Sequence, residues 1–414
     1  MMTLSDKLFE MALGISAPWH VLGTDLDVKE RVLRIRVDFD VGSRFSVAGV
    51  AGMHPVHDTV EKSYRHLNFF QHECHLNVRV PRVKLPDGSV RQVEPEWTGK
   101  LSGFTLLFEA LVMALSREMS FSAVARITGL SVHRVMAICH CYVEQAVSLA
   151  DHSEVKRLAI DETSRAKGHE YVTLAADAER RAVIFVAEGK DANTIEGLAG
   201  NLRAHQGRPT QIEAISIDMS PAFIKGVGEH FPNAQVTFDK FHVIAHASTA
   251  IDQTRRLEQK LDPSIKGLRW ALLKDRRAVR GARRQELDAL LVKMTTKRTA
   301  RAWHYREQLR EILTRKQPNI VRALLAQWCT NVLRSKVGPM KEVAQLVRNH
   351  FEGILSWVST RQTNGFLEAI NGLFQAAKRK ARGYTRFRTI RTVIFLIAGK
   401  LDFSKLNPYI AQPT

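Results

Sequence analysis

The sequence contains 414 residues, of which 45% are hydrophobic and 25% are charged. This composition excludes a disordered chain, and the length allows two or three domains with cores of their own. The 61 lysines and arginines outnumber the 42 aspartates and glutamates, and the net charge of +19 favours a polyanionic partner such as nucleic acid.

Cysteine usage and hydropathy predict an intracellular protein. The four cysteines form no Cys-x-x-Cys pair, and a chain of this size is not expected to need a disulfide framework. We find no signal peptide and no run of about 18 apolar residues. We therefore expect a cytoplasmic, nucleoid-associated protein without a membrane partner.

Residues 1–100 are expected to form a small β-rich module. Between Arg31 and Val41 apolar residues alternate with charged ones, which is the period of a half-buried strand. Two further strands are predicted at 75–80 and 90–93, joined by the turn sequence Pro86-Asp87-Gly88.

Residues 101–152 are predicted to be helical, with a helix-turn-helix motif for DNA binding. Ala125 lies four residues before Gly129, and these small residues permit two helices to cross closely. Ser131 can cap the second helix.

If this motif binds DNA, His133 and Arg134 face the groove. The alternative interpretation is an ordinary pair of packed helices, which occurs in any helical domain.

Residues 153–249 contain predicted elements in the order of a ribonuclease-H-like fold. In that fold three strands form an antiparallel meander, and later strands add in parallel through right-handed crossovers. The predicted strands are 155–161, 171–175, 182–187, 212–218 and 235–238, and the predicted helices are 193–205 and 221–230.

Three acidic residues are the candidates for catalysis. Asp161 and Asp218 each close an apolar run, and a carboxylate at the end of a buried strand must be desolvated, paired or metal-bound. The first and fourth strands of the expected fold are neighbours, so the two aspartates should lie side by side. With Glu368 from a downstream helix, they could bind two divalent cations about 4 Å apart, as phosphodiester cleavage requires.

Residues 250–350 are predicted to form an α-helical insertion that interrupts the catalytic core, which then resumes over 351–403. The insertion is rich in leucine, alanine, arginine and glutamine, and Pro263 and Pro318 mark expected breaks between its helices.

Two basic segments account for the net charge of the chain. Residues 251–316 carry a net charge of +11, and residues 376–400 contain eight basic and no acidic side chains. The remainder is balanced, so we expect these two segments to engage DNA. A solvated helical face is the alternative interpretation of either run.

The segment around Glu368 places three polar residues on one helical face. Asn364, Glu368 and Asn371 are spaced by four and three residues, so we expect the two amides and the carboxylate to face one target. Basic side chains follow directly and are candidate contacts to the DNA backbone: Lys378, Arg379, Lys380 and Arg382.

At these residues the chain resembles the DDE transposases of the bacterial insertion-sequence family labelled ISL-three. The resemblance runs from about residue 54 to residue 400 and rests on five motifs in a fixed order. They are HDTVEKSYRHLNFFQHE at 57–73, IDET at 160–163, SIDMSPAF at 216–223, FDKFHV at 238–243 and NGFLEAINGLFQAAKRKARGY at 364–384.

The resemblance implies that Asp161, Asp218 and Glu368 are the catalytic acids and hold two magnesium ions, which manganese could replace. Asp239 and His242 match an Asp-x-x-His motif that supports the site or the DNA in related transposases. The alternative interpretation is that these two residues cap a helix.

The chain departs from the family at its N-terminal module. The family usually begins with a cysteine zinc finger, whereas the expected Cys-x-x-Cys pairs are missing here. We therefore expect a degenerate, finger-like module without structural zinc. Side chains that could in principle bind zinc are His54, His57, His72, Cys74 and His75.

Together these features predict a transposase that binds terminal inverted repeats and carries out magnesium-dependent strand cleavage and strand transfer on double-stranded DNA. A homodimer on DNA is expected from the resemblance, because transposases usually pair two ends. A catalytically silent DNA-binding regulator or domesticated derivative is the main alternative. A junction-resolving nuclease of the same fold is a third.

Overall fold

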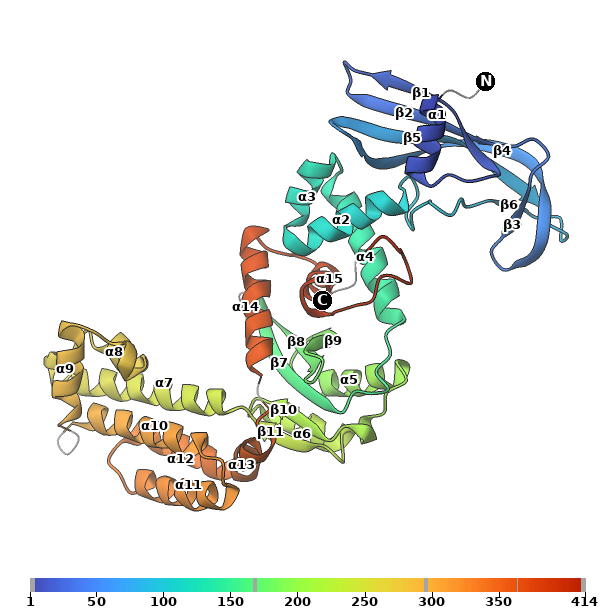
Figure 1. The fold of residues 1–414 in the computed structure, drawn as a ribbon. Helices are drawn as coiled ribbons and strands as arrows, with labels where there is room; N and C mark the ends of the chain where they lie inside the picture. The colour runs from blue at the N-terminus through green and yellow to red at the C-terminus, as the bar shows by residue number, and fades with distance from the viewer. Residues whose placement is uncertain (1–3, 167–169, 294–296, 363, 411–414) are drawn as a thin grey trace. The chain divides into compact units, whose positions relative to one another are not determined.

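The computed structural model describes residues 4–166, 170–293, 297–362 and 364–410. The chain divides into two compact units. The first combines Met1–Ala150 with Ala376–Thr414, and the second is the continuous segment Asp151–Gln375. Both contain helices and strands, so the protein is a mixed α/β protein (Figure 1).

The N-terminal part of the first unit is a six-stranded sheet with one helix. Its strands pair in the order β1-β2-β5-β4-β3, with β6 beside β5, and only β2 and β5 are parallel. The elements are α1 (Leu4–Leu13), β1 (Trp19–Asp27), β2 (Val32–Phe39), β3 (Arg44–Val47), β4 (Val50–Phe69), β5 (His72–Lys84) and β6 (Val90–Gln92).

The strands expected from alternation and from the turn sequence are present. Every second side chain of β2 is apolar and buried. Val41 lies beyond the strand and is fully exposed. Strands β5 and β6 form the predicted hairpin, in which Lys84 pairs with Val90. The long strand β4 was not predicted, because most of its side chains are exposed or half-buried and its apolar pattern is weak.

The N-terminal module is a six-stranded sheet, whereas a small, finger-like module was expected. An apolar core that includes Val21, Ile35 and Leu76 is buried between the strands and α1. The strand register also separates the candidate zinc ligands, because His54 pairs with Phe45 near one end of β4, whereas His72 pairs with Phe69 at the other end.

Three helices follow the sheet, namely α2 (Leu106–Glu118), α3 (Phe121–Thr128) and α4 (Val132–Ser148). The predicted turn between the last two is present. Gly129 has the left-handed φ of 73°, which glycine adopts at little cost, and the Ser131 hydroxyl accepts a hydrogen bond from the backbone N–H of Arg134 at 3.3 Å.

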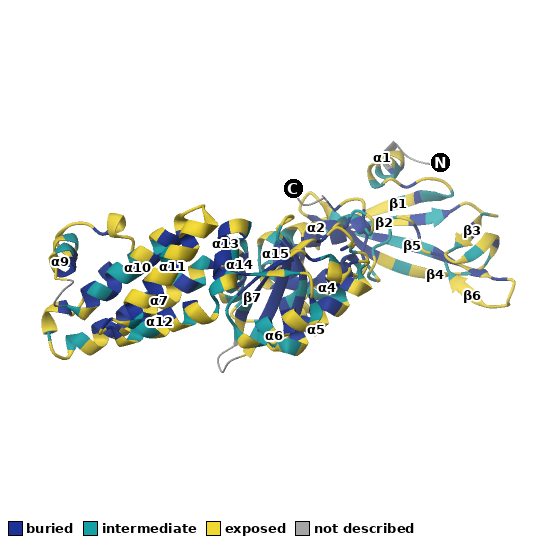
Figure 2. Cartoon of the chain, turned by 90° about the horizontal axis from the view of Figure 1, so that it is seen from below, coloured by how far each residue is buried: buried dark blue, intermediate teal, exposed yellow. Residues whose placement is uncertain are grey.

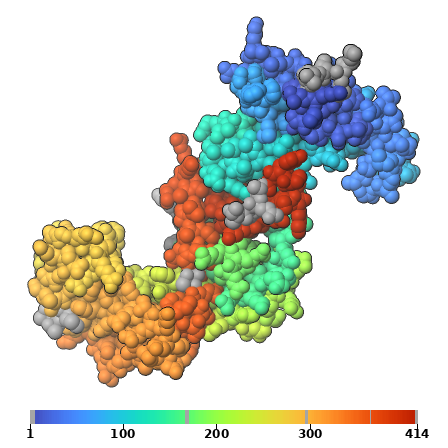
Figure 3. Space-filling model, viewed as in Figure 1, coloured from blue at the N-terminus to red at the C-terminus, as the bar shows by residue number. Residues whose placement is uncertain are grey.

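Residues 376–414 belong to the first unit, so the predicted core segment 351–403 crosses the division between the two units. Helix α15 (Phe387–Ala398) packs against α4 and α2. A bidentate ion pair joins Arg388 to Glu144, and His140 and Thr392 share a buried hydrogen bond of 2.7 Å. Figure 3 shows these C-terminal residues, in red, against the teal surface of α2–α4.

A buried polar network also fixes the C-terminal segment in this unit. The Tyr142 hydroxyl donates to Glu109 at 2.7 Å and accepts from the Asn407 amide at 3.0 Å. The same glutamate accepts the backbone N–H groups of Lys100 and Leu101. Glu109 and Asn407 are fully buried, and burial raises the pKa of Glu109.

The second unit is built on a five-stranded sheet with the order β11-β10-β7-β8-β9. Strands β7, β8 and β9 are antiparallel, and β10 is parallel to both β7 and β11. Figure 2 shows the buried residues of this sheet in dark blue. The elements are β7 (Arg157–Ala166), β8 (Glu170–Asp177), β9 (Ala182–Glu188), α5 (Ala192–Ala204), β10 (Ala214–Ile217), α6 (Pro221–His230) and β11 (Gln235–Phe238), with a 3₁₀ turn at Pro209–Gln211.

These elements follow the predicted order, with one change at the first strand. Strand β7 continues to Ala166, so Asp161 lies in its middle and not at its end. The run Leu-Ala-Ile is apolar because it is covered on both faces of the sheet. The residues that follow are more polar, so the apolar pattern of the sequence did not show that the strand continues. Strand β10 ends directly before Asp218, as predicted.

The expected insertion is helical. Its long first helix starts earlier than predicted, since Asp239 caps it, and breaks occur at Pro263 and Pro318. The helices are α7 (Lys240–Gln259), α8 (Arg269–Leu273), α9 (Ala282–Leu291), α10 (Arg298–Thr314), α11 (Pro318–Leu333) and α12 (Gly338–Asn349), with 3₁₀ turns at Pro263–Ile265 and Arg276–Ala278. In the part of the chain that the structure describes, no helix has the length and apolar character to span a membrane.

Many basic side chains of the insertion are paired within it. Asp252 contacts three arginines on α7 and α8, and Asp288 contacts two more. Arg306 is fully buried and donates to the carbonyl of Leu272 at 2.9 Å. Some of the basic side chains of the insertion therefore stabilise its own helices.

The chain returns to the sheet through α13 (Phe351–Thr360), which packs on β11, and continues into α14 (Gly365–Lys380). Helix α14 starts in the second unit and its last turn belongs to the first. Glu368 lies in its first turn.

Candidate active site

Asp161 and Asp218 lie on neighbouring strands. Strands β7 and β10 are parallel, and Ser216 pairs with Ala159. Two residues further along this register, Asp218 comes level with Asp161, and paired strands are about 4.8 Å apart. Asp161 is 8% exposed, whereas Asp218 is half-buried and accepts the backbone N–H of Ser220 at 3.0 Å.

Helix α14 lies along β7 and is held there by amide side chains. The Asn371 side chain donates to Oδ2 of Asp161 at 2.8 Å, and the Gln375 side chain donates to the Thr163 hydroxyl at 3.0 Å. Asn364 donates instead to the backbone carbonyl of Ile160 at 2.9 Å. Both asparagines therefore reach neighbouring residues of β7, whereas Glu368, which was expected to face the same target, is exposed.

The electrostatics of Asp161 link the three acids. The pKa of Asp161 is raised to about 6, mainly by burial and to a smaller extent by the negative charges of Asp218 and Glu368. A hydrogen bond from the backbone of Glu162 and the charge of His242 act in the opposite direction. Glu368 is exposed on the surface of α14. The three carboxylates thus interact across two strands and one helix.

Asp239 has a clear structural role beside this site. Its side chain accepts the backbone N–H of Phe241, which caps α7, and the backbone N–H of Asn364 at 2.6 Å, which fixes the start of α14. The residue is fully buried. His242 lies in the first turn of α7, and its Nε2 atom is buried without a partner among the described residues.

Comparison with known protein families identifies the family of the chain. Residues 158–394, more than half of the chain and all three acids, match the DDE model of the ISL3 family, which is described as a transposase. Residues 93–143 match the helix-turn-helix domain of transposase family ISL3.

The chain belongs to the ISL3 transposase family.

Two curated transposases are similar to this ISL3 transposase over most of their length. The transposase for insertion sequence element IS1001 of Bordetella parapertussis is 27% identical over 340 residues, which cover 80% of this chain and 82% of the relative. The transposase for insertion sequence element IS1557 of Mycobacterium tuberculosis is 24% identical over 352 residues, or 78% of each chain.

The predicted DNA-binding residues of the transposase all belong to the first unit, whereas the acids belong to the second. His133 is exposed at the start of α4. Arg134 is also exposed, but it donates to the Ser102 carbonyl at 3.0 Å and lies over the Phe104 ring at 4.4 Å. The remaining four are near the end of α14, in its last turn or just after it: Lys378, Arg379, Lys380 and Arg382.

Sequence reasoning missed three residues near the acids of the transposase. Gln375 donates to the Thr163 hydroxyl, and it follows Asn371 by four residues on the same face of α14. His246 follows His242 by one helical turn, and its pKa is lowered by partial burial and by His242 but raised by Asp218. Lys190 pairs with Glu162 at 3.2 Å. The spacing of the two histidines was the available signal, whereas nothing in the sequence pointed to Lys190.

The donor atoms at the transposase site are of the kind that hard divalent cations prefer. Besides the carboxylates, the side-chain oxygen of Asn371 is buried and has no hydrogen-bond partner among the described residues. In the same residues, no three histidine, cysteine, aspartate or glutamate side chains are already arranged to hold one ion. The chemistry of the donors fits a divalent metal, and Glu368 is the acid that would have to turn inward.

Proposed function

We propose that this transposase cleaves and joins DNA strands at the ends of its insertion sequence, with Asp161, Asp218 and Glu368 as the metal-binding catalytic acids. The observation that carries the proposal is the register of β7 and β10, which brings Asp218 level with Asp161 beside the helix that bears Glu368; the charges of both other acids also raise the pKa of Asp161. Such repulsion is offset when cations bind between the carboxylates.

The catalytic core is best described as ribonuclease-H-like. Its support is the meander β7-β8-β9 followed by the parallel additions β10 and β11. This order makes the first and fourth strands neighbours and so pairs the two aspartates.

The residues of the site have different roles in the proposed reaction. Asp161 and Asp218 provide oxygen ligands from a rigid sheet, and Asn371 orients the Asp161 carboxylate by a 2.8 Å hydrogen bond. Glu368 provides a third ligand from α14. Two bound magnesium or manganese ions would activate the attacking water or 3′ hydroxyl and neutralise the leaving oxygen. Asp239 positions the start of α14, since it binds the backbone of Asn364.

DNA recognition is assigned to the first unit. The helices α3 and α4 would read the terminal inverted repeats, with His133 and Arg134 at the groove, while the basic residues after Glu368 hold phosphates. Because Arg134 is already held by Ser102 and Phe104, it would have to be released to reach a base edge. Two copies of the chain would pair the two ends of the insertion sequence as a homodimer.

The substitution Asp161→Asn tests the proposal. We expect it to abolish magnesium-dependent nicking of a DNA fragment that contains the ends of the element, because one ligand loses its charge. Binding of the fragment in a gel-shift assay should be unchanged. Calcium in place of magnesium should support binding without nicking by the unsubstituted chain.

Asp151→Asn is the matched control, because Asp151 is exposed and lies outside the sheet. This variant should nick like the unsubstituted chain. Nicking that persists in Asp161→Asn contradicts the assignment of the acids. Binding without nicking by the unsubstituted chain under magnesium would instead indicate a catalytically silent DNA-binding regulator.

A further inference from the structure

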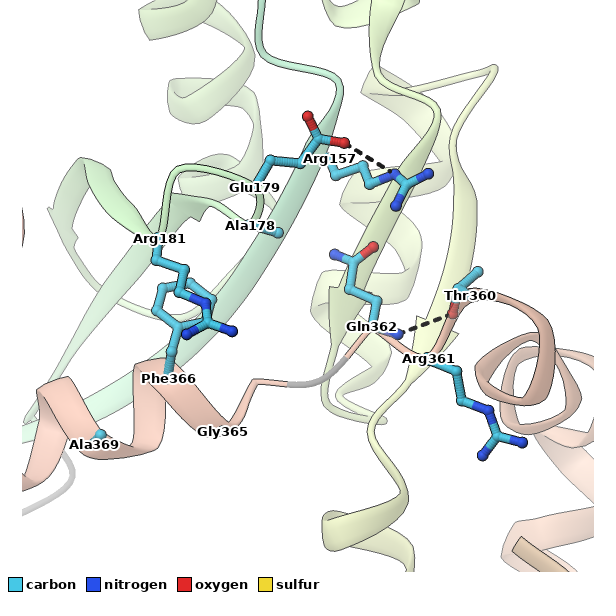
Figure 4. Close-up of a pocket in the computed structure, with 10 residues that line it drawn as sticks. All are labelled: Arg157, Ala178, Glu179, Arg181, Thr360, Arg361, Gln362, Gly365, Phe366 and Ala369. Carbon is cyan, nitrogen blue, oxygen red and sulfur yellow. Dashed lines mark hydrogen bonds and ion pairs between the residues drawn. The ribbon is translucent and has the colours of Figure 1, made fainter. Parts of the chain in front are cut away.

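A cavity of about 560 Å³ lies in the second unit at the start of β7. None of the three acids lines it, although Arg157, in its wall, precedes Asp161 by only four residues on the same strand, or about 13 Å. Its volume is in the range of about 300–1,000 Å³ that is typical of ligand pockets. Figure 4 shows the side chains that surround it.

The cavity is basic. Arg157, Arg181 and Arg361 line it, and Glu179 is its one acidic residue. Glu179 pairs with Arg157 at 3.4 Å, which leaves two positive charges in excess. Among the residues that the structure describes, none pairs with Arg181 through its side chain. Arginine is the side chain best suited to a phosphate, because its planar fork can donate two parallel hydrogen bonds.

Arg361 is held by neighbours that lie outside the cavity lining. It donates to the backbone carbonyl of Arg315 at 2.6 Å, and its guanidinium lies over the ring of Trp357 at 4.3 Å. Neither contact neutralises its charge. In Figure 4 the guanidinium extends away from Arg157 and Arg181, so Arg361 adds positive charge near the cavity and not a direct contact inside it.

The start of α14 adds to the attraction for an anion. Gly365 and Phe366, its first two residues, line the cavity, and the helix is 16 residues long. Backbone N–H groups in the first turn of a helix carry a partial positive charge.

The cavity lining also includes a buried hydrogen-bond acceptor, which a simple anion could not satisfy because it has no N–H group to donate. Gln362 is only 9% exposed, and its Nε2 donates to the backbone carbonyl of Leu158. Its Oε1 is buried and has no partner among the described residues. In Figure 4 the side chain extends toward Arg157. A ligand that brings an N–H group to this oxygen would remove the cost of an unsatisfied buried acceptor.

We propose that this cavity binds one nucleotide of a DNA strand, with its phosphate at Arg181 and an N–H of its base on Oε1 of Gln362. The inference rests on the proposed function, because it takes DNA as the substrate, and it adds a contact to the strand outside the three acids. Every natural base has an N–H donor, so the contact would not select a sequence.

Titration of the full chain with small probes tests the proposal. The probes are thymidine monophosphate, inorganic phosphate and a single-stranded decamer of thymidine, measured by calorimetry without divalent metal. We expect the nucleotide to bind about two- to tenfold more tightly than phosphate, as one added hydrogen bond predicts. The decamer should displace the nucleotide.

Arg181→Gln should weaken binding of the nucleotide about tenfold or more, because a charged hydrogen-bond donor is lost. Arg180→Gln is the matched control, since it removes the same charge one residue away from the cavity and should have no effect. Far-ultraviolet circular dichroism checks that both variants fold.

Several results would overturn the proposal. Equal affinity for phosphate and nucleotide indicates an anion site alone, and a nucleotide that the decamer does not displace indicates a site for free nucleotides. Equal losses in the two arginine variants, or no binding of the nucleotide up to about 10 mM, exclude the cavity as the site. Because no metal is present, these results are independent of cleavage, and a failure of the Asp161→Asn test would leave them unchanged.

Discussion

Asp161 is ionised only at an energetic cost. Its pKa of about 6 means that the folded chain keeps a proton at pH values where the unfolded chain, with the ordinary value of 3.8, has released it. Protonation therefore stabilises the fold. This stability is fully present below the ordinary pKa and is lost as the pH rises through about 6.

The variant Asp161→Asn should lack this loss, because its side chain carries no charge at any pH. Without divalent metal, we expect it to be more stable than the unsubstituted chain above pH 6, by up to about 3 kcal/mol, and the difference should vanish toward pH 4. Urea denaturation at a series of pH values in the presence of a chelator measures this. A difference that does not change with pH would contradict the assigned pKa.

At the level of residues, the sequence indicated which acids matter but not how they are held. Asp161 and Asp218 stand out because a carboxylate beside an apolar run is unusual. The partners of Asp161 could not be predicted, since Asn371 lies 210 residues further along the chain. The arginines of the cavity come from three separate segments, and each of them alone resembles an ordinary surface residue.

At the level of elements, the period of the apolar residues predicted the second sheet well. Helix α6 and strand β11 have the predicted bounds, and Pro221 at the first position of α6 marks the start of that helix. The packing of α15 in the first unit could not be predicted. Its apolar residues suit a catalytic core equally well, and only the pairing of Arg388 with Glu144 and of Thr392 with His140 directs it to α4.

The buried network around Tyr142 makes a prediction at this scale. Tyr142→Phe removes the hydroxyl that Glu109 and Asn407 share, and it leaves a buried carboxylate with one donor fewer. We expect the free energy of unfolding of the first unit to fall by about 1–3 kcal/mol, with faster hydrogen exchange in α2 and α4. Tyr409→Phe is the control, because Tyr409 is half-exposed. Equal stability of the two variants would show that the network contributes nothing.

At the level of the whole molecule, the count of 61 lysines and arginines overstates the number of basic side chains that are free to bind DNA. The insertion places arginines beside aspartates, as the three contacts of Asp252 show. Composition alone does not reveal such pairing. Among the described residues, none forms an ion pair with Arg379, Lys380 or Arg382, the exposed basic residues at and after the end of α14.

This contrast predicts how DNA binding depends on salt. Arg379→Gln should reduce the slope of log affinity against log salt concentration by about 0.9, because one phosphate contact is lost. Arg256→Gln should leave the slope nearly unchanged, since Arg256 is paired with Asp252 at 2.9 Å. Fluorescence anisotropy with double-stranded DNA over a range of salt concentrations gives both slopes. A larger effect at Arg256 would assign DNA binding to the insertion.

The discontinuity of the first unit has a consequence for synthesis. Domains of a growing chain usually fold in the order in which they leave the ribosome. Here α2–α4 emerge early, but α15 and Asn407, which cover them, emerge only after the whole second unit. A chain that stops early therefore lacks the helix that packs on α4, and only a nearly full-length product can complete this unit.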